Sequence, residues 1–579
     1  MAVVELAVLA VIGVALIVTV AAFSKRLGIA APLILVVVGL GLSYLPGLPT
    51  FTVPHDVILM GVLPPLLYAA AVNVPVVDFR RNFGAISSLS VFLVLFSAFA
   101  TGLLLYILLP DLNFAAAVAL GAVVSPPDAV AATSIGKKLG LPPRLVTVLE
   151  GEGLVNDATA LVLLRSAIAA GAGGLASIWD GVADFGFAVV AAVAVGLLVG
   201  VLTVFVRSKL HDPVLDTAIS FVVPFLAFIP AEELGASGVL AVVVAGLYTG
   251  HRAGAAFSAQ ARINDSVNWH TVQFLLENGV FLLMGLEIRY LVENVDPALL
   301  TVREAVLIGL AVTALLIVIR FAWMGPLTLF LRAKVGYQER RTNRFRTILD
   351  SMLAVGLPDA RTRRRHTRGE ELYRRRQADI AQLRGEGLGW RGGVVIGWSG
   401  MRGVVTLAAA QSLPEATPYR EQLVLIAFTV AVVSLLLQGG TLPWVIRLLG
   451  VRGRNAAEDQ RKLATLLDQI SDAGLKVLED PAKCLDQDTQ VDPDVVERVR
   501  QDTFLRSALA WERVKALGIG TTATPQLQYR ALRRAVVDAE RNALLQARRE
   551  GHFPSRALTD AQRLLDLEES RLKARLGEH

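Results

Sequence analysis

Apolar residues occur in this chain as blocks of about twenty, separated by short polar stretches, up to about residue 450. A helix needs about 20 apolar residues to cross the hydrocarbon core of a bilayer. The pattern therefore predicts an all-α polytopic membrane protein with about thirteen transmembrane helices. The predicted spans are approximately 3–23, 29–45, 57–75, 84–109, 114–136, 145–170, 181–206, 213–230, 236–250, 264–287, 302–331, 393–413 and 421–446.

The composition supports this class, because 54% of the residues are hydrophobic, more than a soluble domain needs to fill its core. The first block, 3–23, follows no basic leader and precedes no small-residue cleavage site. We therefore expect a retained helix rather than a signal peptide. The one cysteine, Cys484, excludes an intrachain disulfide and lies in no redox motif.

Basic residues are concentrated in every second loop between the predicted spans. The alternate loops, around 46–56, 110–113, 171–180 and 230–235, contain no Lys or Arg. By the positive-inside rule the basic loops are cytoplasmic, so we expect an odd number of spans in the plasma (inner) membrane, with the N-terminus outside and the C-terminus in the cytoplasm. The basic loops hold Lys25, Arg26, Arg80, Arg81, Lys137, Lys138, Arg144, Arg207, Lys209, Arg252, Arg262 and the run from Arg332 to Arg391, whereas Arg289, Arg303 and Arg420 break the pattern.

Two polar regions accompany the predicted transmembrane domain, residues 1–450. Residues 332–392 form a basic cytoplasmic loop within it, which we expect to fix the topology and to contact anionic membrane lipid rather than nucleic acid. From residue 451 to 579 the composition is that of a soluble region, and 529–550 and 559–576 have helical periodicity. This pattern predicts a cytosolic helical tail, which serves either dimerisation and stability or regulation.

Two of the predicted spans are interrupted. In the fifth, Ser125-Pro-Pro-Asp128 contains two prolines that remove backbone donors from the helix. In the twelfth, Gly397–Gly403 places three glycines and an arginine inside an apolar run. If the chain consists of two inverted six-helix repeats and one extra helix, these breaks occupy equivalent positions. Such pairs mark the midplane binding site of transporters, and we expect two crossing broken helices.

Polar side chains lie in the sixth span. Glu152 and Asn156 are four residues apart and share one helix face, and Asp157 lies about 100° further round. A carboxylate at membrane depth costs at least ~2.5–3.5 kcal/mol, so it needs a partner, a water-filled cavity or a bound cation. Carboxylate and amide oxygens are hard ligands, which suit Na⁺, Li⁺, H⁺ or a hard divalent ion rather than a soft transition metal.

Asp128 directly follows the double proline, where the second half of the fifth span begins. A carboxylate at this position can cap the half-helix. At the membrane midplane beside Asp157 it is also within reach of a cation, so we favour a ligand role over capping alone. The predicted site for the transported cation or proton therefore comprises Asp157, Asp128, Asn156 and Glu152.

Arg320 is an isolated charge well inside the eleventh span and needs a buried acid. Glu152 is the candidate. This pairing makes Glu152 structural and leaves Asp157 to exchange cations.

Other polar residues lie in or near the predicted spans. Arg402, in the broken twelfth span, is expected to compensate the C-terminal dipole of a half-helix or the charge of Asp128 rather than to act as a ligand. For Arg165, also inside a span, the sequence suggests no partner. The remaining candidates are Glu277 and Asn278, which could line a vestibule, and Glu232 and Glu233, which could form a solvated funnel for cations.

These motifs together resemble the signature segments of the cation:proton antiporter-1 family, the bacterial and eukaryotic Na⁺/H⁺ exchangers. The segments are Ser125–Ala131, Glu150–Asp157, Arg320 and Gly400–Leu407, and the resemblance covers about residues 1–450. It implies thirteen helices, a homodimer, a six-helix core formed partly by the crossing broken helices, and elevator-like alternating access.

The resemblance also implies roles for single residues. The family's Asn–Asp pair, carried onto Asn156 and Asp157, implies electroneutral exchange of one cation for one proton. Its ligands map to Asp157, Asp128 and the Glu152 region, and its buried ion pair maps to Arg320 and Glu152.

Two positions depart from the family's pattern. Gly153 stands where several members have a hydroxyl residue, and Pro127 stands where a Thr often precedes the aspartate. The exact coordination, and with it the ion selectivity, therefore does not follow from the resemblance.

The residues suggest competition at one carboxylate as the mechanism. Burial favours the protonated form of Asp157, whereas a nearby cation favours its charged form, so the site holds either H⁺ or Na⁺. The predicted function is secondary active exchange of Na⁺ for H⁺ in pH and sodium homeostasis. The sequence has no Gly-rich phosphate loop, and we expect neither an enzyme nor a cofactor.

Three alternatives remain open. K⁺/H⁺ exchange is one, because ligand type alone does not separate Na⁺ from K⁺. A cation channel would need a continuous pore lined by rings of ligands, whereas paired broken helices favour one occluded site. An intramembrane hydrolase with Asp128 and Asp157 as an acid dyad is disfavoured by their different motifs and by the nearby arginines.

Overall fold

The structure is a computed structural model. It describes residues 3–27, 29–46, 53–171, 178–210, 212–355, 359–385, 389–451, 456–479, 492–519 and 525–550, together with 561, 562 and 565. Cys484 and nearly all of the predicted helix 559–576 lie outside the described residues. The chain forms two compact units, residues 1–452 and 453–579.

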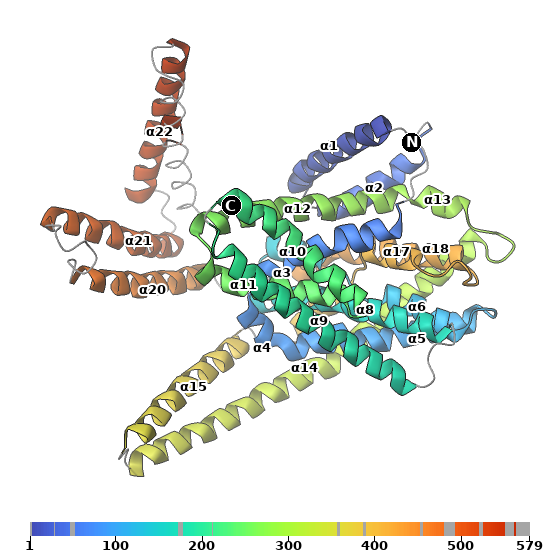
Figure 1. Ribbon diagram of the computed structural model, residues 1–579, viewed down its shortest axis with the longest axis horizontal. Coiled ribbons are helices and arrows are strands. Elements are labelled where there is room, and N and C mark those ends of the chain that lie inside the picture. Colours follow the sequence, from blue (N-terminus) through green and yellow to red (C-terminus); the bar gives the residue numbers. More distant parts are fainter. Residues whose placement is uncertain are drawn as a thin grey trace. The chain divides into compact units, whose positions relative to one another are not determined.

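The first unit is helical throughout its described elements (Figure 1). In chain order the helices are α1 (Val3–Leu27), α2 (Ala31–Ser43), α3 (Leu63–Asn73), α4 (Val76–Ser87), α5 (Val94–Leu108), α6 (Phe114–Val124), α7 (Ala129–Lys138), α8 (Pro143–Gly171), α9 (Ile178–Arg207), α10 (Pro213–Glu233), α11 (Gly238–Ala256), α12 (Ala259–Leu286), α13 (Ile288–Glu293), α14 (Val302–Val355), α15 (Ala360–Gly385), α16 (Trp390–Trp398), α17 (Val404–Gln411), α18 (Arg420–Ser434) and α19 (Gly440–Leu449). Short π-helical segments, η1 (Val57–Val62), η2 (Ser88–Leu93) and η3 (Leu435–Gly439), lead into α3, α5 and α19.

Within the described residues, nine helices are long and apolar enough to cross a membrane. Three shorter apolar helices, Val8–Ser24, Ala31–Ser43 and Val57–Asn73, coincide with the first three predicted spans. The prediction of an all-α polytopic membrane protein is confirmed. The number thirteen and the inverted repeats stay predictions.

The basic connection between the eleventh and twelfth predicted spans is a helical hairpin. Helix α14 is 54 residues long and extends beyond the apolar eleventh span to Val355, and α15 then returns toward α4 (Figure 1). This helicity could not be predicted from an apolar stripe, because the hairpin is charged on most faces.

Both predicted helix breaks are confirmed. The fifth span is divided between α6, which ends at Val124, and α7, which begins at Ala129. The twelfth is divided between α16, which ends at Trp398, and α17, which begins at Val404. The two breaks meet, because the backbone N–H of Asp128 donates to the carbonyl of Met401 at 2.7 Å.

Helix α8 lies between two buried apolar clusters. Leu149 of α8 belongs to a cluster shared with α5, α6, α14 and α18, whereas Leu154 belongs to one shared with α3, α10 and α11. The polar face of α8 is therefore held at the boundary between the two groups of helices.

The second unit contains α20 (Ala456–Leu475), the short 3₁₀ segment η4 (Lys476–Glu479), α21 (Pro493–Ile519) and α22 (Pro525–Glu550). Helices α20 and α21 pack against each other, and the indole N–H of Trp511 donates to Asp468 at 2.6 Å. The helix predicted at 529–550 is present as part of α22. A cytosolic location for this unit stays a prediction.

Candidate functional site

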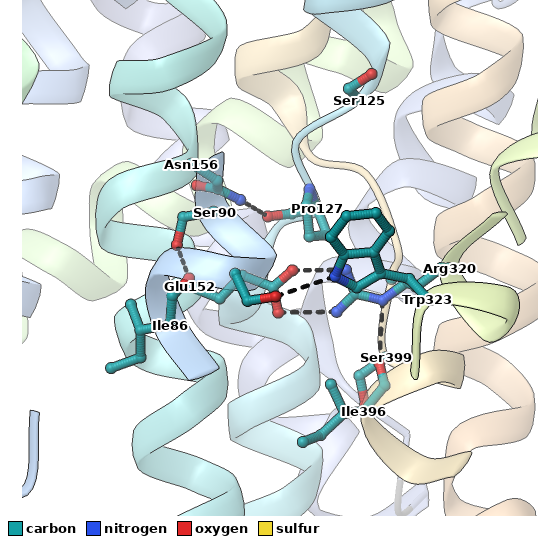
Figure 2. Close-up of polar contacts among 12 residues, drawn as sticks. Ile86, Ser90, Ser125, Pro127, Glu152, Asn156, Arg320, Trp323, Ile396 and Ser399 are labelled. Carbon is teal, nitrogen blue, oxygen red and sulfur yellow. Dashed lines mark hydrogen bonds and ion pairs between the residues drawn. The ribbon is translucent and has the colours of Figure 1, made fainter. Parts of the chain in front are cut away.

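Glu152 of α8 and Arg320 of α14 form an ion pair at the centre of the first unit (Figure 2). Both oxygens of the carboxylate are held, Oε1 at 2.5 Å and Oε2 at 2.8 Å from the guanidinium. The residues are only 1% and 3% exposed. Arg320 also donates through Nε to the Ile396 carbonyl at 3.1 Å, so one guanidinium links α8, α14 and α16. Because Arg320 holds both carboxylate oxygens, Glu152 acts on this site through its charge rather than as a free ligand.

Asn156, one turn further along α8, faces the break in the fifth span (Figure 2). Its amide Nδ2 donates to the Pro127 carbonyl at 2.6 Å. Its Oδ1 is buried and has no hydrogen-bond partner among the described residues. A buried acceptor without a partner is uncommon in native proteins and indicates a ligand or a water at that position.

Asp157 differs from Glu152 in having no compensating group. Its side chain is half-buried, and no hydrogen bond or ion pair to its carboxylate occurs within the described parts of the chain. It lies within electrostatic range of Asp128. The structure thus brings two carboxylates together at the crossing without a basic side chain bonded to either.

Asp128 caps the second half of the broken helix. Its Oδ1 accepts the backbone N–H of Val130 at 2.8 Å, as expected for an N-cap residue. A Cβ atom added to Gly403 would overlap the Asp128 carboxylate, so glycine is required where α17 begins. The capping role is present, and the role as a cation ligand stays a prediction.

Arg402 compensates backbone dipoles. Its guanidinium donates to the carbonyls of Val124 at 2.9 Å and Ser125 at 3.2 Å, and also to that of Gly400. The first two carbonyls belong to the C-terminal end of α6, where the helix dipole is negative. Of the two roles predicted for Arg402, the contacts therefore favour the half-helix terminus over Asp128.

The charges at the crossing leave one net negative charge. Glu152 and Arg320 cancel, Arg402 adds one positive charge, and ionised Asp128 and Asp157 contribute two negative charges. One proton or one monovalent cation would neutralise this group of five side chains.

Glu277 of α12 also lies close to this region, and Asn278 follows it on the same helix. Glu277 accepts a hydrogen bond from Gln273 at 2.6 Å and is within electrostatic range of Asp128 and Lys137. Lys137 itself forms an ion pair with Glu150 at 2.7 Å. The Oδ1 atom of Asn278 is buried without a partner among the described residues. The interpretation that these two residues line a vestibule stays a prediction.

The partner of Arg165, which the sequence did not suggest, is Glu232. The two form an ion pair between α8 and α10, and Glu232 also accepts the backbone N–H of Gly238 at 2.8 Å at the start of α11. Glu232 is therefore an ion-paired residue, and its part in a solvated funnel stays a prediction. Glu233 beside it is exposed.

A second buried ionic cluster was missed. Arg207 at the end of α9 bonds both oxygens of Asp216, at 2.7 and 2.6 Å, and Asp265 at 2.5 Å. By its position in the sequence, Arg207 is only one of the basic residues of a predicted loop. Its partners are on α10 and α12, and no spacing in the sequence relates the three residues.

Glu287, at the end of α12, was also missed and is 2% exposed. Its carboxylate accepts the backbone N–H of Val53 at 2.8 Å and the side-chain amide of Gln411 at 3.3 Å. Within the described residues it has no ion pair. It is the last residue of the predicted span 264–287, and no motif in the sequence distinguishes it.

The glycine at position 153, where several family members have a hydroxyl residue, has a steric reason. A Cβ atom added to Gly153 would lie 2.6 Å from the Cβ of Ala129, closer than real Cβ atoms approach. Helices α7 and α8 thus meet at these two residues, and a hydroxyl side chain does not fit between them.

We expect Gly153→Ala to lower the thermal unfolding midpoint of the purified protein, at a cost of about 1–3 kcal/mol for the added methyl group. The double variant Gly153→Ala/Ala129→Gly removes the methyl group that it meets and should recover most of this loss. Gly13→Ala is the matched control, because nothing lies within 4 Å of that added Cβ. An unchanged midpoint in Gly153→Ala would show that the close approach is unimportant.

Two interrupted helices that meet beside buried charges define the class of secondary ion transporters rather than channels or enzymes. Comparison with known proteins agrees. The family described as sodium/hydrogen exchanger, transmembrane, matches residues 12–448. The chain therefore belongs to the sodium/hydrogen exchanger family, whose members are transporters.

Individual relatives have related names, and one solved structure has a similar fold. A protein of Mycobacterium tuberculosis (strain ATCC 25618 / H37Rv), called an uncharacterized Na⁺/H⁺ exchanger, is 28% identical over 94% of this chain and 92% of its own length. A sodium, potassium, lithium and rubidium/H⁺ antiporter of Bacillus pumilus is 30% identical over 51% of this chain and 45% of its own. The structure of the sodium proton antiporter MjNhaP1 from Methanocaldococcus jannaschii has a TM-score of 0.54 and 17% identity, and covers 78% of this chain and 100% of that one. At this identity the likeness shows the fold alone.

Proposed function

We propose that this protein exchanges Na⁺ for H⁺, one for one, at a single site whose exchanging group is Asp157. The supporting observation is the contrast on α8, where Arg320 neutralises Glu152 while Asp157 has no bonded partner among the described residues. A carboxylate at membrane depth without a compensating side chain needs a proton or a cation. Asp157 therefore alternates between these two partners.

Asp128 and Asn156 are the additional ligands in this proposal. Asp128 uses one oxygen as a helix cap, and Asn156 has an unpartnered buried Oδ1. Carboxylate and amide oxygens suit a hard alkali cation. Glu152, Arg320 and Arg402 hold the surrounding helices in place.

The charge at the crossing supports electroneutral exchange. The five charged side chains sum to one negative charge, which either one Na⁺ or one H⁺ cancels. The two loaded forms carry the same net charge, so both can move by alternating access without moving charge across the membrane. The empty form retains a charge in a region of low dielectric, which disfavours its movement.

We further propose a homodimer in the plasma (inner) membrane, with the N-terminus outside and the C-terminus in the cytoplasm. The alternation of basic loops with loops that contain no Lys or Arg supports this orientation. In the cell such exchange would regulate intracellular pH and sodium.

K⁺/H⁺ exchange is the second candidate. The name of the Bacillus pumilus relative includes potassium, lithium and rubidium. A series of Na⁺, Li⁺, K⁺ and Rb⁺ gradients in proteoliposomes separates these substrates.

We expect the apparent affinity for Na⁺ to weaken as the pH falls, because H⁺ and Na⁺ compete for Asp157. The loss should reach up to about tenfold per pH unit once the site is mostly protonated. Turnover should be bell-shaped in pH, since high pH depletes the proton and low pH excludes Na⁺. The measurement is pH-jump fluorescence in proteoliposomes at several Na⁺ concentrations.

The same vesicles test electroneutrality. An imposed membrane potential, set by valinomycin after K⁺ has been excluded as a substrate, should leave both limbs of the pH profile unchanged. A rate that follows voltage, or a Na⁺ affinity that is flat across pH, would reject the single-site electroneutral mechanism.

A further inference from the structure

A pocket of about 470 Å³ lies where α4 meets the helical hairpin of α14 and α15. In Figure 1 the returning end of α15 approaches α4. Three sequence-distant segments thus form one cavity, which is separate from the crossing of the broken helices. By the loop charges, this end of the first unit is the predicted cytoplasmic side.

The pocket is strongly basic. Its lining includes Arg80 of α4, Lys334 and Arg341 of α14, and Arg376 of α15. None of these four forms an ion pair within the described residues. The acidic residue in the lining, Asp379, is already paired.

The pocket is held in shape by contacts at its edge. Arg81 of α4 donates to Asp379 of α15 at 2.6 Å. Arg144 at the start of α8 donates to Asn82 at 2.9 Å and to the Leu383 carbonyl at 3.0 Å. These bonds fix the end of α15 against α4 and α8, so the basic groups are brought together by the fold.

The pocket has room beside Gly84, and its lining includes apolar as well as charged side chains. A Cβ atom on Gly84 would lie 3.0 Å from the Lys334 ammonium, so the glycine provides room for that group. Phe83 and Ile380 add apolar surface to the lining. The Arg376 guanidinium lies 5.3 Å from the ring centroid of Phe345, which orients it without neutralising it.

We propose that this pocket binds a phosphate-bearing anion that also carries an apolar portion. Four cationic groups without acidic partners favour an anion, and guanidinium groups bind phosphate through paired hydrogen bonds. The volume lies within the range of about 300–1,000 Å³ typical of small-molecule sites. Phosphate of this kind occurs in anionic lipid headgroups at the membrane surface and in soluble phosphate esters.

The test uses the full-length protein in neutral detergent and measures its thermal unfolding midpoint against probe concentration. One arm adds dioctanoyl phosphatidylglycerol, with dioctanoyl phosphatidylcholine as the zwitterionic comparison. The other adds ADP, with adenosine as the uncharged comparison. A ligand that binds only the folded state raises the midpoint as its concentration increases. Stabilisation in the first arm alone identifies a lipid headgroup, and stabilisation in the second alone identifies a soluble phosphate ester.

The pocket variant is Arg80→Gln/Lys334→Gln/Arg341→Gln. It should weaken the apparent affinity for the active probe about tenfold or more, because it removes three charge-assisted contacts. The matched control, Arg361→Gln/Arg364→Gln/Arg375→Gln, removes the same charge from exposed residues of α15 outside the pocket and should respond as the unmodified protein does.

A second variant, Gly84→Leu, keeps every charge and places a side chain in the cavity. It should also lose the response, and it tests the site if the triple variant fails to fold. No stabilisation in either arm, or equal responses in the pocket and control variants, would overturn the proposal. Because binding is measured without transport, this outcome is independent of the proposed exchange activity.

Discussion

Asp157→Asn should abolish Na⁺-driven proton movement in proteoliposomes, reducing it to the level of empty vesicles. The substitution preserves the size and shape of the side chain but removes the group that holds either a proton or Na⁺. No hydrogen bond or ion pair to Asp157 is found in the described parts of the chain, so insertion and the unfolding midpoint should change little. The measurement combines pH-jump fluorescence with a thermal melt of the same preparation.

Asp184→Asn is the matched control for this substitution. It makes the same chemical change at an exposed position of α9, and it should retain exchange. Exchange that survives in purified Asp157→Asn vesicles would remove Asp157 as the carrier and direct attention to Asp128. Loss of exchange in both variants would indicate a general effect of removing an acidic group from a membrane helix.

Local signals in the sequence were sufficient for the helix breaks and for one contact at their crossing. Pro126 and Pro127 remove two successive backbone donors and disfavour the helical conformation of the residues before them, so the break before Asp128 could be predicted from local chemistry. Arg320 required a buried acid because an unpaired charge at that depth is costly, and Glu152 was the acid already placed inside a neighbouring span. In both cases a large energetic cost at one or two residues excluded most of the possible local structures.

Other features could not be predicted because they depend on the packing of distant helices. Arg165 and Glu232 are 67 residues apart, and Glu232 is close to a loop, where a solvated carboxylate is the simpler interpretation. Arg207 forms ion pairs with residues on two other helices. For Gly153, the sequence showed that a hydroxyl group was missing but not the reason, because its neighbour Ala129 is on another helix.

Removing one partner of the Glu152–Arg320 pair should destabilise the protein by about 3–5 kcal/mol, because it leaves the other charge buried and uncompensated. Removing both should cost clearly less than the sum of the single losses, since neither charge then remains. The measurement is a double-mutant cycle with Glu152→Gln and Arg320→Gln, followed by thermal melts in detergent.

The Arg165–Glu232 pair provides the comparison within the same fold. The Arg165 side chain is 50% exposed, against 3% for Arg320, so solvent already screens it and its coupling should be about 0–1 kcal/mol. A large coupling for the buried pair and a small one for the exposed pair would identify Glu152 and Arg320 as an architectural link between α8 and α14. Additive losses at Glu152 and Arg320 would mean that their contact contributes nothing specific, and Glu152 would then become a second candidate for the exchanging carboxylate.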